Sequence, residues 1–225
     1  MKKYIVLLLV LFFAGSTLAG TQLNITIGDT VNAKLASGLV DPKVGGIEVN
    51  LNGTTIGYNV GSDAIWAGCY LFDIEGMVNN YKSFCFDVTS DPALSYTVHT
   101  AYTIGSDIKY MWGTYYDGVI NDAVKAAAFQ LAVWEMMHES ESYDISSGDF
   151  YLEALNTSSS NNNGATFDGL IALTNDYLNS NNWTNLADLV MLDDGTHQPF
   201  AVEVPEPATV VLLGLGGLLF GKRRA

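Results

Sequence analysis

Two apolar segments, one near each end of this 225-residue chain, limit how much of it can form a folded domain. Near the N-terminus, Lys2 and Lys3 precede an apolar run at residues 4–14. Small residues at Thr17 and Ala19 then occupy the two positions that a signal peptidase reads. This arrangement is typical of a secretory signal peptide. It predicts that residues 1–19 are removed after Ala19, and that the rest of the chain is exported.

The C-terminal segment combines a helix-breaking tripeptide, a short apolar run and a basic end. Pro205, Glu206 and Pro207 interrupt regular structure and precede the uncharged residues 208–220, and basic residues occupy 222–224. A full transmembrane helix needs about 20 apolar residues, so this run is short. Cations that follow an apolar run stay on the cytoplasmic side. The segment therefore predicts a C-terminal membrane anchor.

These C-terminal features together resemble the PEP-CTERM sorting signal of Gram-negative bacteria. In that family a membrane protease called exosortase recognises the Pro-Glu-Pro tripeptide and processes the tail during export. The resemblance implies that residues 204–225 form a sorting signal with a short transmembrane helix. It also implies an exosortase-type protease as a partner, and delivery to the cell envelope, cell surface or extracellular matrix. The alternative is an ordinary C-terminal membrane anchor.

The residues between the two segments, 20–203, suit a single extracellular domain. Five of the ten basic residues and one of the 24 acidic residues, Glu206, belong to the targeting segments, so five basic residues remain against 23 acidic ones. Because such a surface repels nucleic acid, we expect no nucleic-acid partner. His99, His138 and His197 are too scattered to form a ligand pattern, so no metal site or cofactor is expected.

Residue patterns predict an α+β protein with a β-rich, sandwich-like or barrel-like body and a packed helical portion. Alternation and turn residues favour strands before residue 118, including a hairpin turn at Asn52-Gly53. The clearest helix covers 121–139, with Asn121 or Asp122 as its N-cap. The remaining expected elements are strands at 22–27, 44–58, 70–74, 83–88, 94–102 and 198–204, and weaker helices at 150–155 and 166–179.

One polar side chain lies on the apolar face of the predicted helix. At 3.6 residues per turn, Gln130 shares a face with Ala126, Ala127, Trp134 and Met137. A buried amide without hydrogen bonds costs about 1–3 kcal/mol. We therefore expect a partner for Gln130, and the predicted strand at 83–88 offers Cys85.

Phe84-Cys85 and the Phe-Gln-Leu-Ala-Val-Trp sequence at 129–134 resemble the thioester domains of bacterial surface adhesins. In that family a Cys after an aromatic residue and a downstream helical Gln join with loss of ammonia. The resemblance implies a thioester between Cys85 and Gln130, shielded by Phe84, Phe129 and Trp134. It also implies covalent attachment to a target that carries amine or hydroxyl groups, without enzymatic turnover. The Gram-positive adhesins are usually anchored to peptidoglycan, so the different export signal leaves the target open.

Three other interpretations of these residues compete with the thioester. Cys69 and Cys85 are the only cysteines, and a disulfide between them would contribute about 3 kcal/mol in the chain-entropy model. It would exclude the thioester and leave a non-reactive structural protein of the envelope or biofilm matrix. A hydrolase would use Cys85 as nucleophile and His99 or His138 as base. The third interpretation is that a cluster of aromatic rings binds sugar by stacking; core packing explains the same cluster equally well. The cluster contains Tyr110, Trp112, Tyr115 and Tyr116.

Overall fold

The computed structural model describes residues 25–36, 42–57, 65–76, 81–140 and 142–204. The predicted signal peptide (1–19) and the Pro205-Glu206-Pro207 tripeptide lie outside these residues. About 28% of these described residues are helical and 33% are in strands, and they form two sheets and three α-helices. The α+β class with a sheet-rich body is therefore confirmed.

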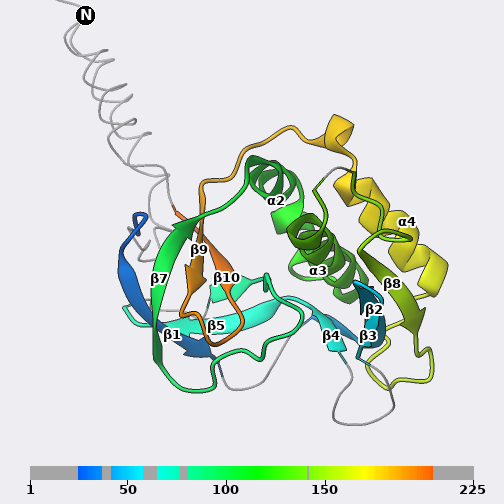
Figure 1. The fold of residues 1–225 in the computed structure, drawn as a ribbon, viewed down its shortest axis with the longest axis horizontal. Helices are drawn as coiled ribbons and strands as arrows, with labels where there is room; N and C mark the ends of the chain where they lie inside the picture. Colours follow the sequence, from blue (N-terminus) through cyan, green and yellow to red (C-terminus); the bar gives the residue numbers. More distant parts are fainter. Residues whose placement is uncertain (1–24, 37–41, 58–64, 77–80, 141, 205–225) are drawn as a thin grey trace, which may run out of the picture.

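The larger sheet has six antiparallel strands in the order β10-β9-β7-β1-β5-β6 and closes into a barrel (Figure 1). Just after β6, Cys85 forms an isolated bridge with Phe200 on β10. The Phe86 N–H donates to the Pro199 carbonyl at 2.8 Å, and the Ala201 N–H donates to the Phe84 carbonyl at 3.4 Å. The first and last strands of the sheet are thereby joined. The strands are β1 (Thr30–Leu35), β5 (Tyr70–Ile74), β6 (Tyr81–Ser83), β7 (Thr97–Thr103), β9 (Leu189–Asp193) and β10 (Phe200–Glu203).

The second sheet is built around β2 (Lys43–Leu51), which pairs antiparallel with the other three strands. These are β3 (Thr54–Ile56), β4 (Ile65–Gly68) and β8 (Phe150–Leu155). The turn between β2 and β3 contains Asn52 at φ 52° and Gly53 at φ 80°. Two consecutive positive φ angles are the signature of a tight hairpin turn, so the hairpin predicted at Asn52-Gly53 is confirmed.

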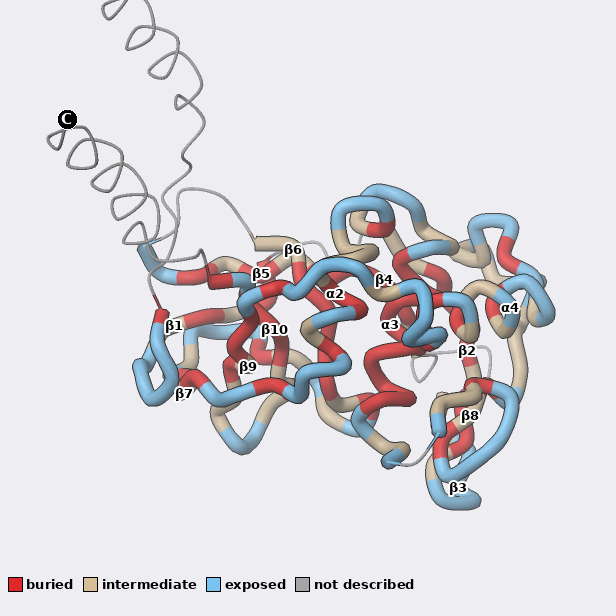
Figure 2. Tube along the Cα trace, turned by 90° about the horizontal axis from the view of Figure 1, so that it is seen from above, coloured by how far each residue is buried: buried red, intermediate tan, exposed pale blue. Residues whose placement is uncertain are grey.

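Three α-helices pack at the side of the barrel, namely α2 (Ser106–Val119), α3 (Ala123–His138) and α4 (Phe167–Leu178); a 3₁₀ turn, η1 (Ser180–Asn182), follows α4. Helix α3 is buried on every side from Ala126 to Met136, which is typical of a helix inside a core. It contacts α2, α4, β2, β4 and β8. Figure 2 shows this buried helix between more exposed elements. Met137, expected on the buried face, is instead 42% exposed, because α3 emerges from the core at its end.

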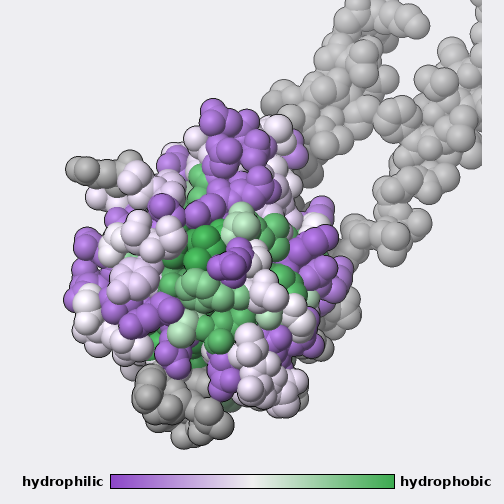
Figure 3. Space-filling model, turned by 90° about the vertical axis from the view of Figure 1, so that its right-hand side faces the viewer, coloured by the Kyte–Doolittle hydropathy of each residue, from purple (hydrophilic) through white to green (hydrophobic). Residues whose placement is uncertain are grey.

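Two apolar cores result from this arrangement. The barrel core contains Phe72 and Phe200, whose rings stack with centroids 3.7 Å apart. The helical core lies between the outside of the barrel, the second sheet and the helices, and it includes most of α3. On the helical end of the molecule, hydrophobic residues gather in the middle of the surface, with polar residues around them (Figure 3).

Four predicted elements are wrong. Of the strand expected at 83–88, only Ser83 belongs to β6, and after it Cys85 forms an isolated bridge. Residues 150–155 form a strand, β8, because Phe150 and Leu152 alternate inward against β2. Residues 106–119 form helix α2 in a region expected to be strands. The strand expected at 22–27 is a turn over its described part, and pairing begins at Thr30.

Helix α3 depends on its N-cap for its first turn. The Asp122 carboxylate accepts hydrogen bonds from the N–H groups of Val124 and Lys125, each at 3.1 Å. We expect Asp122→Ala to lower the free energy of unfolding by about 1 kcal/mol, because the two N–H groups lose this acceptor. Urea denaturation measures the effect, and Asp122→Asn, which keeps a capping oxygen, is the matched control. An equal loss in both variants would contradict the capping role.

Candidate functional site around Cys85 and Gln130

The Gln130 carboxamide lies against the main chain of Cys85. The Cys85 N–H donates to Gln130 Oε1 at 3.0 Å, and Gln130 Nε2 donates to the Cys85 carbonyl at 2.6 Å. Both residues have no exposed surface. The main-chain groups of Phe84 and Phe86 bond toward β10, so those of Cys85 point away from β10, toward α3. The carboxamide therefore occupies the position that a neighbouring strand would take.

The Cys85 thiol and the two main-chain groups that bind the Gln130 carboxamide belong to one residue. Successive strand side chains alternate between the two cores: Phe84 and Phe86 belong to the helical core and Cys85 belongs to the barrel core. Strand-like pairing places the carboxamide carbon opposite the Cys85 Cα. Strand side chains stand roughly perpendicular to the plane of the main-chain hydrogen bonds. The Cys85 side chain therefore leaves the main chain toward the barrel core, out of the plane of its hydrogen bonds to Gln130.

Two of the three predicted shielding residues lie together beside this pair. The Phe84 and Phe129 rings have centroids 4.7 Å apart, and each ring also meets Trp112 at 5.6 Å. Trp134 is buried as well, but its ring contact is with Phe150, at 6.4 Å. The sequence does not indicate Trp112 as part of the site, because its pattern predicts strands in the region that forms α2.

The Cys85 side chain is a neutral thiol rather than a thiolate. Burial raises its pKa, and the nearby groups of Cys69 and Asp87 raise it further. The neutral thiol therefore dominates at neutral pH. Any attack by this sulfur must transfer the thiol proton as the new bond forms.

Cys69 and Cys85 are both buried. Cys69 lies in the helical core, in the segment between β4 and β5, whereas Cys85 lies in the barrel core. The two side chains belong to different cores, yet Cys69 is close enough to raise the pKa of the Cys85 thiol. No disulfide joins these two described residues.

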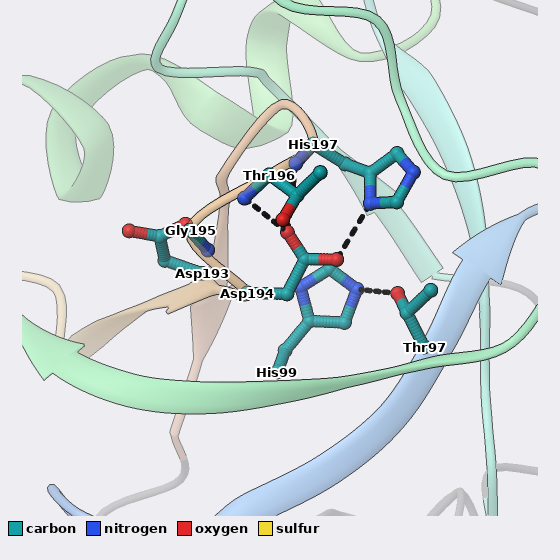
Figure 4. A network of polar contacts seen from close by, with 7 residues as sticks. All are labelled: Thr97, His99, Asp193, Asp194, Gly195, Thr196 and His197. Carbon is teal, nitrogen blue, oxygen red and sulfur yellow. Dashed lines mark hydrogen bonds and ion pairs between the residues drawn. The ribbon is translucent and has the colours of Figure 1, made fainter.

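The histidines belong to other networks. His99 Nε2 lies 2.9 Å from Thr97 Oγ1, and the His99 ring meets Phe200 edge-on at 5.4 Å. Figure 4 shows His99 beside the turn between β9 and β10, where Asp194 Oδ2 lies 2.6 Å from His197 Nδ1. His138 stacks on Phe150. These contacts do not include Cys85, so they give no support to a Cys/His hydrolase. Among the described residues, no group of His, Cys, Asp or Glu could hold a metal ion.

The aromatic residues on α2 mostly serve packing. Trp112 is fully buried and stacks on Tyr116 at 5.0 Å. The Tyr116 hydroxyl donates to the Lys82 carbonyl at 2.6 Å, and Tyr115 packs against Tyr177 at 4.7 Å. Sugar stacking is therefore not supported for Trp112 and Tyr116. Tyr110 alone in this group is largely exposed.

The comparisons with known proteins identify the C-terminal signal. A family model described as the PEP-CTERM protein-sorting motif matches residues 203–225. Neither the curated proteins nor the solved structures yielded a match to the chain. The described helices include none that is long and apolar enough to cross a membrane. The chain is therefore an exported protein that carries a PEP-CTERM sorting motif and is sorted by exosortase; its C-terminal segment initially anchors it in the membrane.

Proposed function

We propose that this exported protein attaches covalently to a target through an internal thioester between Cys85 and Gln130. The observation that carries the proposal is the pair of reciprocal hydrogen bonds between the Gln130 carboxamide and the Cys85 main chain. They hold the amide in one orientation, on the same residue that supplies the thiol. This preorganisation converts the attack into a reaction between neighbouring, aligned groups.

Thioester formation needs no further reactant. The Cys85 Sγ bonds to the Gln130 carboxamide carbon, and the bond from that carbon to Nε2 breaks. The thiol proton leaves with the nitrogen, which departs as ammonia. Charge that develops on Oε1 during the addition is stabilised by the Cys85 N–H, which already donates to that oxygen.

Capture of a target reverses the roles of the two ends. An amine or hydroxyl group adds to the same carbon, the carbon–sulfur bond breaks, and the sulfur takes up the proton as a thiol. The Gln130 side chain then holds the target through an amide or ester bond. The step runs once, so the protein is an adhesive rather than an enzyme. A covalent bond exceeds the ceiling of non-covalent affinity.

Complete burial of Cys85 and Gln130 fits a bond that must survive until a target arrives. The rings of Phe84, Phe129 and Trp112 exclude water on the side of the helical core. A target nucleophile therefore reaches the carbon only through a local opening. We expect small amines such as methylamine to react faster than amines on polymers.

A non-reactive matrix protein is the second candidate, favoured by the same contacts. The Gln130 carboxamide satisfies two buried main-chain groups, which is by itself a sufficient reason for a buried glutamine. In that case the Gln130 amide stays intact and Cys85 is not acylated.

Counting thiols distinguishes these outcomes. The purified chain is unfolded in denaturant at mildly acidic pH with excess maleimide and without reductant, and labelled cysteines are counted by mass. The thioester predicts one label, on Cys69. Two labels would overturn the proposal in favour of the intact amide, and no label would indicate a disulfide. Gln130→Glu, which cannot release ammonia, is the matched control and should take two labels.

A further inference from the structure

The barrel ends one residue before the sorting tripeptide. The last strand, β10, continues to Glu203, and the Val204 N–H donates to the Asp188 carbonyl at 2.7 Å. Val204 itself is only 9% exposed. The fold is therefore fixed up to the residue that precedes Pro205.

Very little chain separates this point from the membrane. The apolar run begins at Ala208, four residues after Val204. Four residues of extended chain span at most about 14 Å. The headgroup region on each side of a bilayer is about 5–7 Å thick. Until the tail is processed, the end of the barrel at Val204 must therefore lie at or close to the headgroups.

We call the end of the barrel that contains Val204 the anchor end. The pairing of the strands determines which residues lie there. Met191 on β9 pairs with Tyr102 of β7 on one side and with Ala201 of β10 on the other. The C-terminal ends of β7 and β10 therefore lie at the same end of the barrel. The turn before β1 joins them, because the Gly28 N–H donates to the Ala101 carbonyl at 2.9 Å. In Figure 1, β7 and β10 end and β1 begins toward the top of the barrel.

Three large apolar side chains protrude at the anchor end. Ile27 in the turn before β1 is 67% exposed, Tyr102 at the end of β7 is 47% exposed, and Leu186 is 60% exposed. Leu186 belongs to this end because it lies two residues before Asp188, the partner of Val204. Apolar and tyrosine side chains are the types that enter the interfacial layer of a bilayer.

We propose that the anchor end rests on the membrane surface, with Ile27, Tyr102 and Leu186 inserted among the headgroups of zwitterionic lipids. The charge of this end determines which lipids it favours. Three carboxylates lie there, those of Asp29, Asp188 and Glu203. The Lys109 ammonium group forms an ion pair with Asp188 at 3.8 Å. Anionic headgroups would be repelled by these carboxylates. The inference does not depend on the thioester.

The test uses the full chain reconstituted in phosphatidylcholine vesicles. Single cysteines replace Ile27, Tyr102, Leu186 or Leu94 and are labelled with an environment-sensitive fluorophore; Cys69 and Cys85 are buried in the native protein. Leu94 is the matched control, since it is 81% exposed and lies at the opposite end of the barrel, where the Leu35 N–H donates to the Ala93 carbonyl. Spin-labelled lipid is then added as a quencher.

We expect loss of emission at positions 27, 102 and 186 and none at 94. Replacing part of the phosphatidylcholine with phosphatidylglycerol should weaken the quenching. Equal quenching at all four positions, or none at the anchor end, would overturn the proposed orientation. Stronger quenching with phosphatidylglycerol would overturn the choice of zwitterionic lipid.

Discussion

Replacing Gln130 with methionine is expected to lower the free energy of unfolding by about 2–6 kcal/mol. Methionine has a similar length but cannot hydrogen-bond to the Cys85 N–H or to the Cys85 carbonyl. Each buried polar group left without a partner costs about 1–3 kcal/mol, and here two are affected. Urea denaturation measures the change, provided that the free energy of unfolding depends on urea concentration with the same slope in both proteins.

The background for this comparison should be Cys85→Ala. That variant keeps both main-chain hydrogen bonds but cannot form a thioester, so any loss on adding Gln130→Met reports the hydrogen bonds alone. Gln198→Met is a control for loss of another buried amide, whose Nε2 donates to the Asp87 carbonyl. A loss below about 1 kcal/mol for Gln130→Met would mean that the carboxamide does not substitute for a strand.

Glu135 should make stability fall as the pH rises. It is fully buried on α3, Oε1 accepts from the Asp144 N–H at 2.7 Å, and Oε2 has no hydrogen-bond partner among the described residues. Burial raises the pKa of this carboxyl from 4.5 to about 8. The folded state therefore holds the proton more tightly than the unfolded state. Its contribution to the free energy of unfolding is fully present below pH 4.5 and is lost as the pH rises toward 8, on the order of 5 kcal/mol in all.

Glu135→Gln isolates this effect, because glutamine stays neutral and still accepts from Asp144. We expect the stability of the variant relative to the native protein to increase steadily between about pH 4.5 and 8. Thermal or urea unfolding across that range gives the difference. Glu48→Gln, on β2, controls for the removal of one negative charge from an acidic protein. A difference that does not change with pH would show that Glu135 is solvated in the folded state.

The elements predicted best are those with a local cause. Helix α3 follows from uninterrupted helix formers after the Asp122 cap, and the β2–β3 hairpin follows from Asn52-Gly53. The need for a partner at Gln130 also follows from local periodicity, because the amide lies on an apolar face. Its exact partner does not, since the sequence suggested the Cys85 side chain and the structure shows the Cys85 main chain.

The elements that failed depend on distant residues. The apolar residues of β8 alternate only because β2, about 100 residues earlier, offers it a partner. Helix α2 contains Gly113, Thr114, Tyr115 and Tyr116, whose intrinsic preferences oppose a helix; packing of Trp112 against Phe84 and Phe129 stabilises it instead. Barrel closure through Cys85 and Phe200 likewise joins segments that no local pattern connects.

The intact mass of the purified, unreduced protein tests the central claim most directly. A Cys85–Gln130 thioester predicts a mass lower by one ammonia than the sequence mass, and methylamine should then add its full mass at Gln130 and release the Cys85 thiol. Cys85→Ala should show neither change. A native mass equal to that of the sequence, and unaltered by methylamine, would contradict the thioester and leave Gln130 as a structural amide in an exosortase-sorted matrix protein.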